Sequence, residues 1–254
     1  VGSSANCAAA VLALNSAVAE QLNLFREEVD GLIEHGKAKE KALFSVIKRY
    51  ISECEAIRFD GNGYSEEWKE EASKRGLDCE TSVPLIIDKY LADSAVKMFG
   101  STKVLSLAEL QSRCEVKWEN YSLKLQIESR VLGDLVINHV LPAAKRYQTL
   151  LLEKVAHTKQ VFAIEEATEL NKQDCLLIRR IESHASAIIA GVDKMTQLRI
   201  TANHIDNQRE RAIAFHDTIV PIMADIRKHV DELEMWIDDQ LWTLPKYREL
   251  LFIR

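Results

Sequence analysis

The pattern of apolar and polar positions along this chain is that of α-helices. In residues 5–35 one apolar position recurs every three or four residues, namely at Val11, Leu14, Val18, Leu22, Phe25, Val29 and Leu32. This spacing places the seven side chains on one face of a helix. Gly36 is a natural stop, and residues 38–54 repeat the pattern through Leu43, Ile47, Tyr50, Ile51 and Cys54. We therefore expect two antiparallel helices.

A rigid turn follows at residues 58–77, whose sequence is RFDGNGYSEEWKEEASKRGL. Residues 60–63 are turn formers, Ser65 is a good N-cap and Gly76 stands where a left-handed C-cap belongs. The helix between them is only about ten residues long, and so short a helix is marginal by itself. Its apolar side chains must therefore dock on something, and these are Trp68, Ala72 and Leu77.

The middle of the chain predicts one short and two long helical stretches. A short helix is expected from residue 81 through Leu91. The spacing of Ser106 and Glu109 is that of a capping box, so a long helix should begin there and run to Pro142. The proline should kink or interrupt that helix, because it lacks an N–H and clashes with the preceding turn. Helical pattern then resumes to about Phe162.

The last long segment runs from about Glu166 to Leu241, and either residues 203–208 or Pro221 divides it. Within it, a 4-3-4-3-4 seam passes through Ile219, Met223, Ile226, Val230, Leu233 and Ile237. The seam lasts under three heptads, so packing inside a bundle is favoured over a free coiled coil. The predicted fold is all-α: a bundle of long helices with short docked helices and a pinned C-terminal tail.

The composition agrees with an all-α fold and excludes some classes of binding partner. Only 9 glycines and 4 prolines occur among 254 residues, which leaves few turns for a β-rich fold. The net charge is −6 without a basic block, so nucleic acid is not an expected partner. No apolar run approaches the roughly 20 residues that span a bilayer, so no membrane is expected either. The five cysteines are widely spaced and are expected to be reduced thiols.

A search for catalytic or ligand-binding motifs finds none. Seven histidines are present, but no Glu-x-x-His pair of a helical di-metal site and no H-E-x-x-H motif occurs. The i,i+4 pairs Glu153/His157 and Asp225/His229 are interpreted as surface pairs rather than metal ligands. Phosphate-binding loops, nucleophile elbows and kinase signatures are also absent. No residue is predicted to be catalytic, cofactor-binding or metal-binding. On its residues alone the chain is a helical structural or interaction module.

Several long stretches resemble the type III glutamine synthetases. These are residues 58–77, residues 127–148 (IESRVLGDLVINHVLPAAKRYQ) and residues 230–252 (VDELEMWIDDQLWTLPKYRELLF). The opening VGSSAN resembles the segment directly after the final catalytic Glu-x-Arg strand of that family. The order of the segments is kept, and they cover most of the chain. Two positions depart from the family pattern, Gln240 in place of Glu and Thr243 in place of Pro.

The resemblance implies that the parent protein is a cytoplasmic enzyme of nitrogen metabolism that ligates ammonia to glutamate. ATP phosphorylates the γ-carboxylate, and Mg²⁺ or Mn²⁺ ions neutralise the phosphates. Those ligands lie upstream of Val1 in the family, so none is assigned to this chain. Residues 1–57 would complete the catalytic domain, and residues 58–254 would form the helical domain of this type. The implied partners are the rest of the catalytic domain and the neighbouring subunits of two stacked hexameric rings.

Four aromatic residues are predicted to be structural anchors. Tyr64 and Trp68 would hold the short helix after the turn, and Trp242 and Tyr247 would pin the tail. The tail would dock on the chain's own bundle or, as the alternative, on a neighbouring subunit. An alternative function is also open, that of a free-standing helical scaffold or interaction module. A regulatory small-molecule site between helices has no sequence signal behind it.

Overall fold

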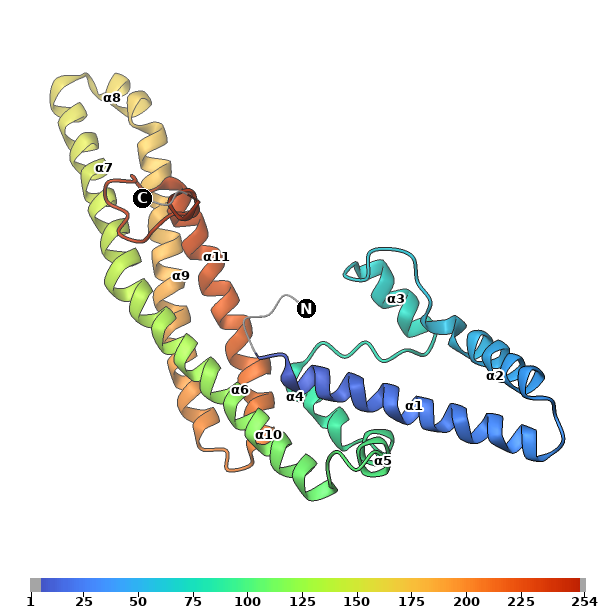
Figure 1. Ribbon diagram of the computed structural model, residues 1–254. Coiled ribbons are helices and arrows are strands. Elements are labelled where there is room, and N and C mark those ends of the chain that lie inside the picture. Colours follow the sequence, from blue (N-terminus) through green and yellow to red (C-terminus); the bar gives the residue numbers. More distant parts are fainter. Residues whose placement is uncertain (1–5, 252–254) are drawn as a thin grey trace. The chain divides into compact units, whose positions relative to one another are not determined.

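The computed structural model describes residues 6–251, and within them no β-strand occurs. The predicted all-α class is therefore confirmed. The helices are α1 (Ala8–Glu34), α2 (Lys39–Glu53), α3 (Glu66–Lys74), α4 (Val83–Asp88), α5 (Asp93–Ser101), α6 (Leu107–Leu135), α7 (Leu141–Val161), α8 (Ile164–Leu170), α9 (Lys172–Asn203), α10 (Gln208–Ala214), α11 (Val220–Trp236) and α12 (Tyr247–Leu250). Figure 1 labels them in chain order.

The chain divides into two compact units, Val1–Val116 and Lys117–Arg254. The first unit contains α1 to α5 and the start of α6, and the second contains the remainder. The boundary that the sequence predicts after residue 57 rests on the family resemblance. That boundary stays a prediction.

In the first unit α1 and α2 form the expected antiparallel hairpin. Gly36 adopts a φ of +85° in the connection, a left-handed conformation that glycine adopts without strain. Val29, Ala42 and Val46 are buried between the two helices. The Phe25 ring meets the Tyr50 ring edge-on with centroids 5.9 Å apart. This small core covers the C-terminal half of α1.

A second apolar cluster of the first unit lies where α5 turns into α6. It is formed by Phe99, Leu105 and Leu110, and Leu12 of α1 packs against it. The predicted capping box begins α6: the Ser106 amide donates to Glu109 Oε2 at 2.8 Å. The Glu109 amide donates to Ser106 Oγ at 3.3 Å. The hydrogen bonds that its carboxylate accepts hold the pKa of Glu109 below its ordinary value.

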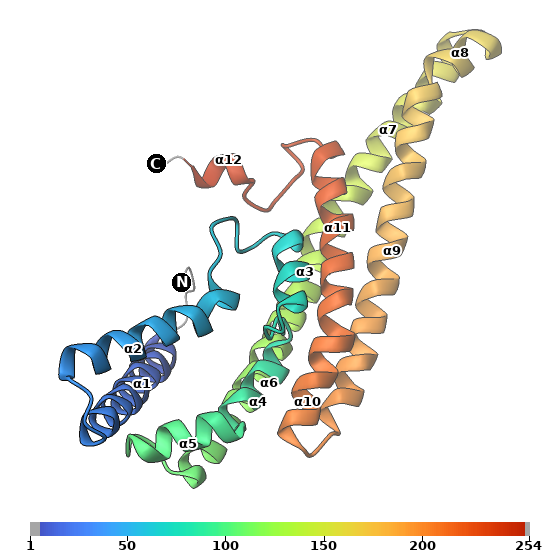
Figure 2. The ribbon, with the colours of Figure 1, turned by 90° about the vertical axis from the view of Figure 1, so that its right-hand side faces the viewer.

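The second unit is a bundle built on α7, α9 and α11, which run side by side in both ribbon views (Figures 1 and 2). The predicted seam of α11 faces α9 and is buried along its length, with Met223 half-buried. Gly191 of α9 allows the close approach, because a Cβ atom there would lie 2.8 Å from Ile226 Cγ1. The seam therefore packs inside a bundle, as the sequence favours.

Two prolines in this unit each follow a π-helical turn. Residues 136–140 and residues 215–219 form single π-helical turns, and each precedes a proline, Pro142 and Pro221. In each turn the closing amide bonds to the carbonyl five residues earlier. The wider turn relieves the clash between the proline ring and the preceding carbonyls. The regular α-helix is therefore interrupted by a π turn before Pro142, while helical hydrogen bonding continues through both prolines.

The last long segment, from about Glu166 to Leu241, is divided at residues 204–207, between α9 and α10. The Asn207 side chain accepts a hydrogen bond from the Glu210 amide at 3.0 Å and caps α10. Two separate helices therefore occupy this region, as one of the two sequence alternatives proposed.

Helix α1 also changes one expectation drawn from composition. It is long enough and apolar enough to cross a membrane by length and composition alone, and only 6% of its apolar window is buried. Runs of alanine and leucine produce this result, since Glu20 is the only charged residue between Ala8 and Phe25. The expectation that no segment approaches the length of a membrane span is therefore wrong for this helix.

Candidate functional site

The turn at residues 58–65 is held by an aromatic stack. The rings of Phe59 and Trp68 lie 3.9 Å apart and within 19° of parallel. The Phe59 ring folds back over Gly61, where a Cβ atom would stand 2.5 Å from Phe59 Cζ. A side chain at position 61 would have to displace the Phe59 ring, so glycine suits this close approach. Asn62 closes the turn, because its side chain accepts from the Tyr64 amide at 3.1 Å.

Both ends of α3 form as the sequence predicts. Ser65 Oγ accepts a hydrogen bond from the Trp68 amide at 3.2 Å. At the other end Gly76 has a φ of +75°, and the Leu77 amide donates to the Ala72 carbonyl at 2.9 Å. The pKa of Glu67 is lowered by backbone hydrogen bonding and then by the Ser65 hydroxyl. The turn and α3 are thus a preformed unit.

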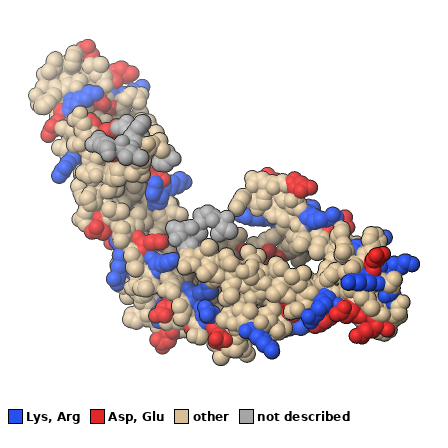
Figure 3. Space-filling model, in the orientation of Figure 1, with Lys and Arg blue, Asp and Glu red and all other residues tan. Residues whose placement is uncertain are grey.

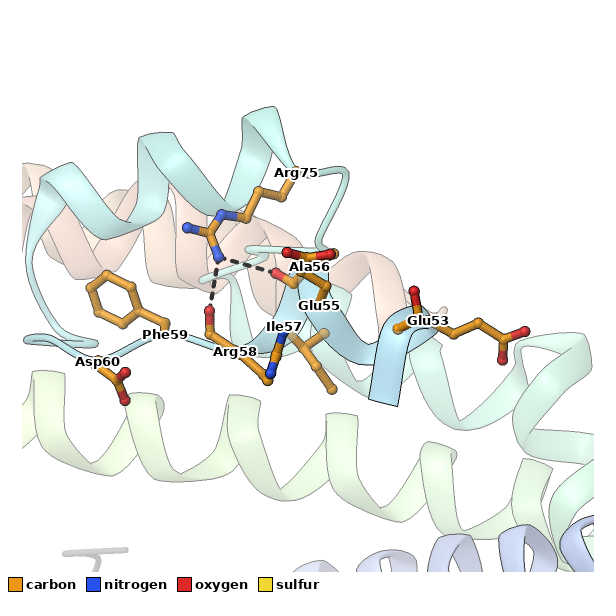
Figure 4. A pocket seen from close by; sticks show the side chains of 9 residues that line it. Glu53, Glu55, Ala56, Ile57, Arg58, Phe59, Asp60 and Arg75 are labelled. Carbon is orange, nitrogen blue, oxygen red and sulfur yellow. Dashed lines mark hydrogen bonds between the residues drawn. The ribbon is translucent and has the colours of Figure 1, made fainter. Parts of the chain in front are cut away.

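Arg75 ties this unit back to the end of α2. Its Nη1 atom donates to the Arg58 carbonyl at 2.9 Å and to the Ala56 carbonyl at 3.4 Å (Figure 4). Its Nε atom pairs with Glu71 at 2.9 Å, and its guanidinium lies 5.4 Å from the Trp68 ring centroid. One side chain therefore connects α3, the turn and the segment after α2.

A surface recess of about 1050 Å³ lies beside Arg75. Its lining residues are Ser52, Glu53, Glu55, Ala56, Ile57, Arg58, Phe59, Asp60 and Arg75. Figure 4 shows the Arg75 guanidinium turned toward backbone carbonyls. The lining contains carboxylates and one further guanidinium, but no nucleophile paired with a base. The recess has the chemistry of a polar surface.

The four predicted anchor residues differ in how deeply they are buried. Trp68 is half-buried in the stack just described. Tyr64 is 91% exposed, so within this chain it anchors nothing, and Phe59 is the ring that packs on Trp68 instead. Trp242 is 9% exposed and belongs to the main core. The side chain of Tyr247 lies outside the described residues.

The tail around Trp242 is held by further contacts to the end of α11. Lys246 Nζ donates to the Glu234 carbonyl at 2.9 Å and pairs with Asp239 at 2.5 Å. The same ammonium lies 5.9 Å from the centroid of the Trp242 ring. These contacts lie within the second unit, so this part of the tail docks on the chain's own bundle.

The histidine contact of the second unit was not predicted. His184 of α9 and His229 of α11 approach with their Nδ1 atoms 2.9 Å apart. The two residues are 45 positions apart, so no local motif could reveal the pair. The signal in the sequence is their spacing from buried residues, because His184 lies three residues after Ile181 of the core and His229 lies three residues after Ile226 of the seam.

In residues 6–251 no group of three or more His, Cys, Asp or Glu side chains is placed to hold a metal ion. All five cysteines are free thiols, with Cys114 buried and Cys7, Cys54 and Cys79 exposed.

Comparison with known proteins shows that the chain is similar to glutamine synthetases. Residues 42–159 match the family model described as the glutamine synthetase C-terminal domain. A glutamine synthetase of Bacteroides fragilis (strain YCH46) is 47% identical over 253 residues, which is 100% of this chain and 35% of the relative. The type-3 glutamine synthetase of Dictyostelium discoideum is 32% identical over 256 residues, or 34% of its length. A glutamine synthetase of Butyrivibrio fibrisolvens is 26% identical over 211 residues.

These matches place the chain among the glutamine synthetases as a C-terminal part. Its resemblance to the type III enzymes is confirmed, since the relative from Dictyostelium discoideum is of that type. The chain spans about a third of the length of the curated relatives it matches.

Proposed function

We propose that this chain is the C-terminal portion of a glutamate–ammonia ligase and that it has a structural role in that enzyme. The observation that carries the proposal is the match of the whole chain to the C-terminal part of proteins named glutamine synthetases. The three segments that resemble the type III family lie within that match.

The structural role rests on what the described residues contain. The buried positions of the second unit are apolar side chains of α7, α9 and α11, and its tail is pinned by Trp242. The sequence contains no recognisable motif for acyl-phosphate chemistry. In residues 6–251 no group of three or more His, Cys, Asp or Glu side chains is placed to hold a metal ion. ATP and Mg²⁺ or Mn²⁺ would therefore bind to the upstream part of the enzyme, in the cytoplasm.

The proposed partners are the rest of the catalytic domain and the neighbouring subunits of a ring-shaped homo-oligomer. A helical bundle with exposed apolar side chains on several helices suits such contacts. In Figure 3 positive and negative side chains are interleaved on the visible face of the second unit, so neither sign of charge dominates that face.

Two assays test the proposal. The full-length protein, incubated with glutamate, ATP, Mg²⁺ and ammonia, should form glutamine and release phosphate. The 254-residue chain alone should form none under the same conditions. An inactive but correctly folded full-length protein would favour the alternative of a free-standing scaffold, and turnover by the isolated chain would overturn the structural assignment.

A further inference from the structure

A second recess, which we call the α6–α9 recess, lies within the second unit and has a volume of about 290 Å³. One side is formed by α6 and by the π turn at residues 136–140, and the other side is formed by α9. Its polar lining includes Arg130, Asp134, Asn138, Thr196 and Arg199. Ligand pockets start at about 300 Å³, so this recess suits a small ligand with several polar atoms.

The two arginines bring like charges from two different helices to this recess. Within residues 6–251 neither the Arg130 nor the Arg199 guanidinium has a hydrogen bond, an ion pair or an aromatic partner. Arg130 is exposed, so water can solvate it, but Arg199 is half-buried. The other half-buried arginines of the described residues each interact with another group, and these are Arg75, Arg209 and Arg211.

A half-buried charge without a partner is unfavourable, because the protein removes part of its hydration and returns nothing. Burial lowers the pKa of Arg199, and the positive charge of Arg130 lowers it further. The carboxylate in the lining is engaged elsewhere, since Asp134 Oδ1 accepts from Asn138 Nδ2 at 2.6 Å. The recess therefore holds two cations for which the described residues supply no counter-ion.

Further hydrogen-bond donors line the same recess. The Thr196 hydroxyl makes no hydrogen bond within residues 6–251, and the Asn138 amide has a second N–H besides the one that Asp134 accepts. Asn138 reaches this position because it lies on the π turn before Pro142, and π turns inside α-helices occur frequently at functional sites.

We propose that the α6–α9 recess binds a phosphoryl group, either as inorganic phosphate or as a small phosphomonoester. Two guanidiniums match the charge of nearly −2 and the three acceptor oxygens of such a group. A carboxylate carries one charge and two oxygens, which a single guanidinium already satisfies. This inference does not depend on the proposed function.

Calorimetric titration of residues 1–254 with inorganic phosphate, in chloride buffer of matched ionic strength, tests the proposal. Binding should be saturable at one site, and Arg199→Gln or Arg130→Gln should each raise Kd about tenfold or more. Arg199→Lys should give an intermediate Kd, because lysine keeps the charge without the fork. The matched control is Arg180→Gln, since Arg180 is also on α9 but lies over the Trp236 ring, and it should leave Kd unchanged.

Parallel titrations with glycerol 2-phosphate and acetate identify the ligand class. The tighter of the two phosphoryl compounds is the better model of the natural ligand, and acetate should not compete with it. No saturable binding of either phosphoryl compound, equal competition by acetate, or the same loss of affinity in Arg180→Gln would each overturn the proposal.

Stability without ligand separates binding from folding. In phosphate-free buffer Arg199→Gln should leave Tm within about 2 °C of the wild type or raise it, because only an unpaired charge is removed. A fall of many degrees would show that Arg199 serves the fold, and would overturn the site.

In the full-length protein the arginine substitutions at positions 130 and 199 should remove the same phosphate affinity. Binding to residues 1–254 but not to the same recess of the full-length protein would show that another part of the protein covers it, which also contradicts the proposal. The ligase assay reports on the proposed function separately, so the two can fail independently.

Discussion

His184 on α9 and His229 on α11 face each other with their Nδ1 atoms 2.9 Å apart and their ring centroids 5.1 Å apart. At that distance one Nδ1 donates and the other accepts, so both rings cannot carry a proton on this nitrogen. The contact joins the two helices that form the seam of the second unit. It makes the packing of α9 and α11 sensitive to protonation.

Unfolding at different pH values should reveal this sensitivity. The pKa of His184 is lowered, first by burial and then by His229, with Arg180 acting in the same direction and Glu232 against it. Asp225 Oδ2 lies 4.0 Å from His229 Nε2 on the other side of the pair. A lowered folded-state pKa means that the unfolded chain binds more protons below about pH 6.5, so stability should fall as the pH drops through that range.

Urea unfolding between pH 5 and 8 measures the effect. His184→Gln should flatten this part of the stability profile, and His157→Gln, a change at an exposed histidine of α7, should leave it unchanged. A profile with the same slope in the wild type and in His184→Gln would contradict the role of the pair.

Gly191→Ala should destabilise the second unit. The new Cβ atom would stand 2.8 Å from Ile226 Cγ1, so α9 and α11 must move apart or repack at a cost of about 1–3 kcal/mol. The better helix propensity of alanine offsets at most about 1 kcal/mol of that. Chemical denaturation monitored by circular dichroism gives the free energy of unfolding.

Gly133→Ala is the matched control, since a Cβ atom at this helical glycine would lie 3.8 Å from the nearest atoms of Met195 and Val192. That is an ordinary contact, and the substitution should be neutral or stabilising by up to about 1 kcal/mol. If both variants behave alike, close packing at Gly191 is not what limits the approach of the helices.

Trp242→Ala should cost about 3–5 kcal/mol, because it empties a buried aromatic site in the main core. Truncation after Leu241 should lower the Tm at least as much, since it also removes the Lys246 contacts. Trp236→Ala is the comparison, because this ring is 44% exposed and its loss should cost clearly less. An unchanged melting curve after the truncation would refute docking of the tail.

Arg75→Lys should loosen the turn at residues 58–65. A lysine keeps the charge but cannot donate in a planar fork to the Arg58 carbonyl and pair with Glu71 at the same time. Amide hydrogen exchange of residues 58–65 should become faster in this variant. Lys74→Gln, which removes an exposed charge one residue away, should leave that exchange unchanged.

Local signals in the sequence predict much of this structure. The hairpin of α1 and α2, the capping box at Ser106 and the caps of α3 at Ser65 and Gly76 all form where their residues indicate. Each depends on backbone groups a few residues away, so the responsible atoms are close in sequence. The prolines show what local signals do not predict. A π turn in the residues before each proline accommodates its ring, so helical hydrogen bonding continues where a proline alone predicts a kink or a break.

The candidate site was predicted only in part. The turn and Trp68 were identified, but Tyr64, which was expected to anchor the short helix, is exposed, and the ring that stacks on Trp68 is Phe59. A ring on either side of a Gly-Asn-Gly turn can fold over it, and the choice depends on which direction the turn gives the chain. In the structure Phe59 lies over Gly61, where a Cβ atom would stand 2.5 Å from its ring.

The sequence by itself determined the all-α class, the ends of α1, α2 and α3, the start of α6, the buried seam of α11 and the family resemblance, because these depend on periodicity and on local backbone chemistry. Tertiary structure alone decided that half of the α1 apolar face is left uncovered, that His184 meets His229, and that Gly191 sets the approach of α9 to α11. Each of these depends on how far one helix extends along another and on its rotation. Those quantities are set by the packing of side chains that are distant in the sequence.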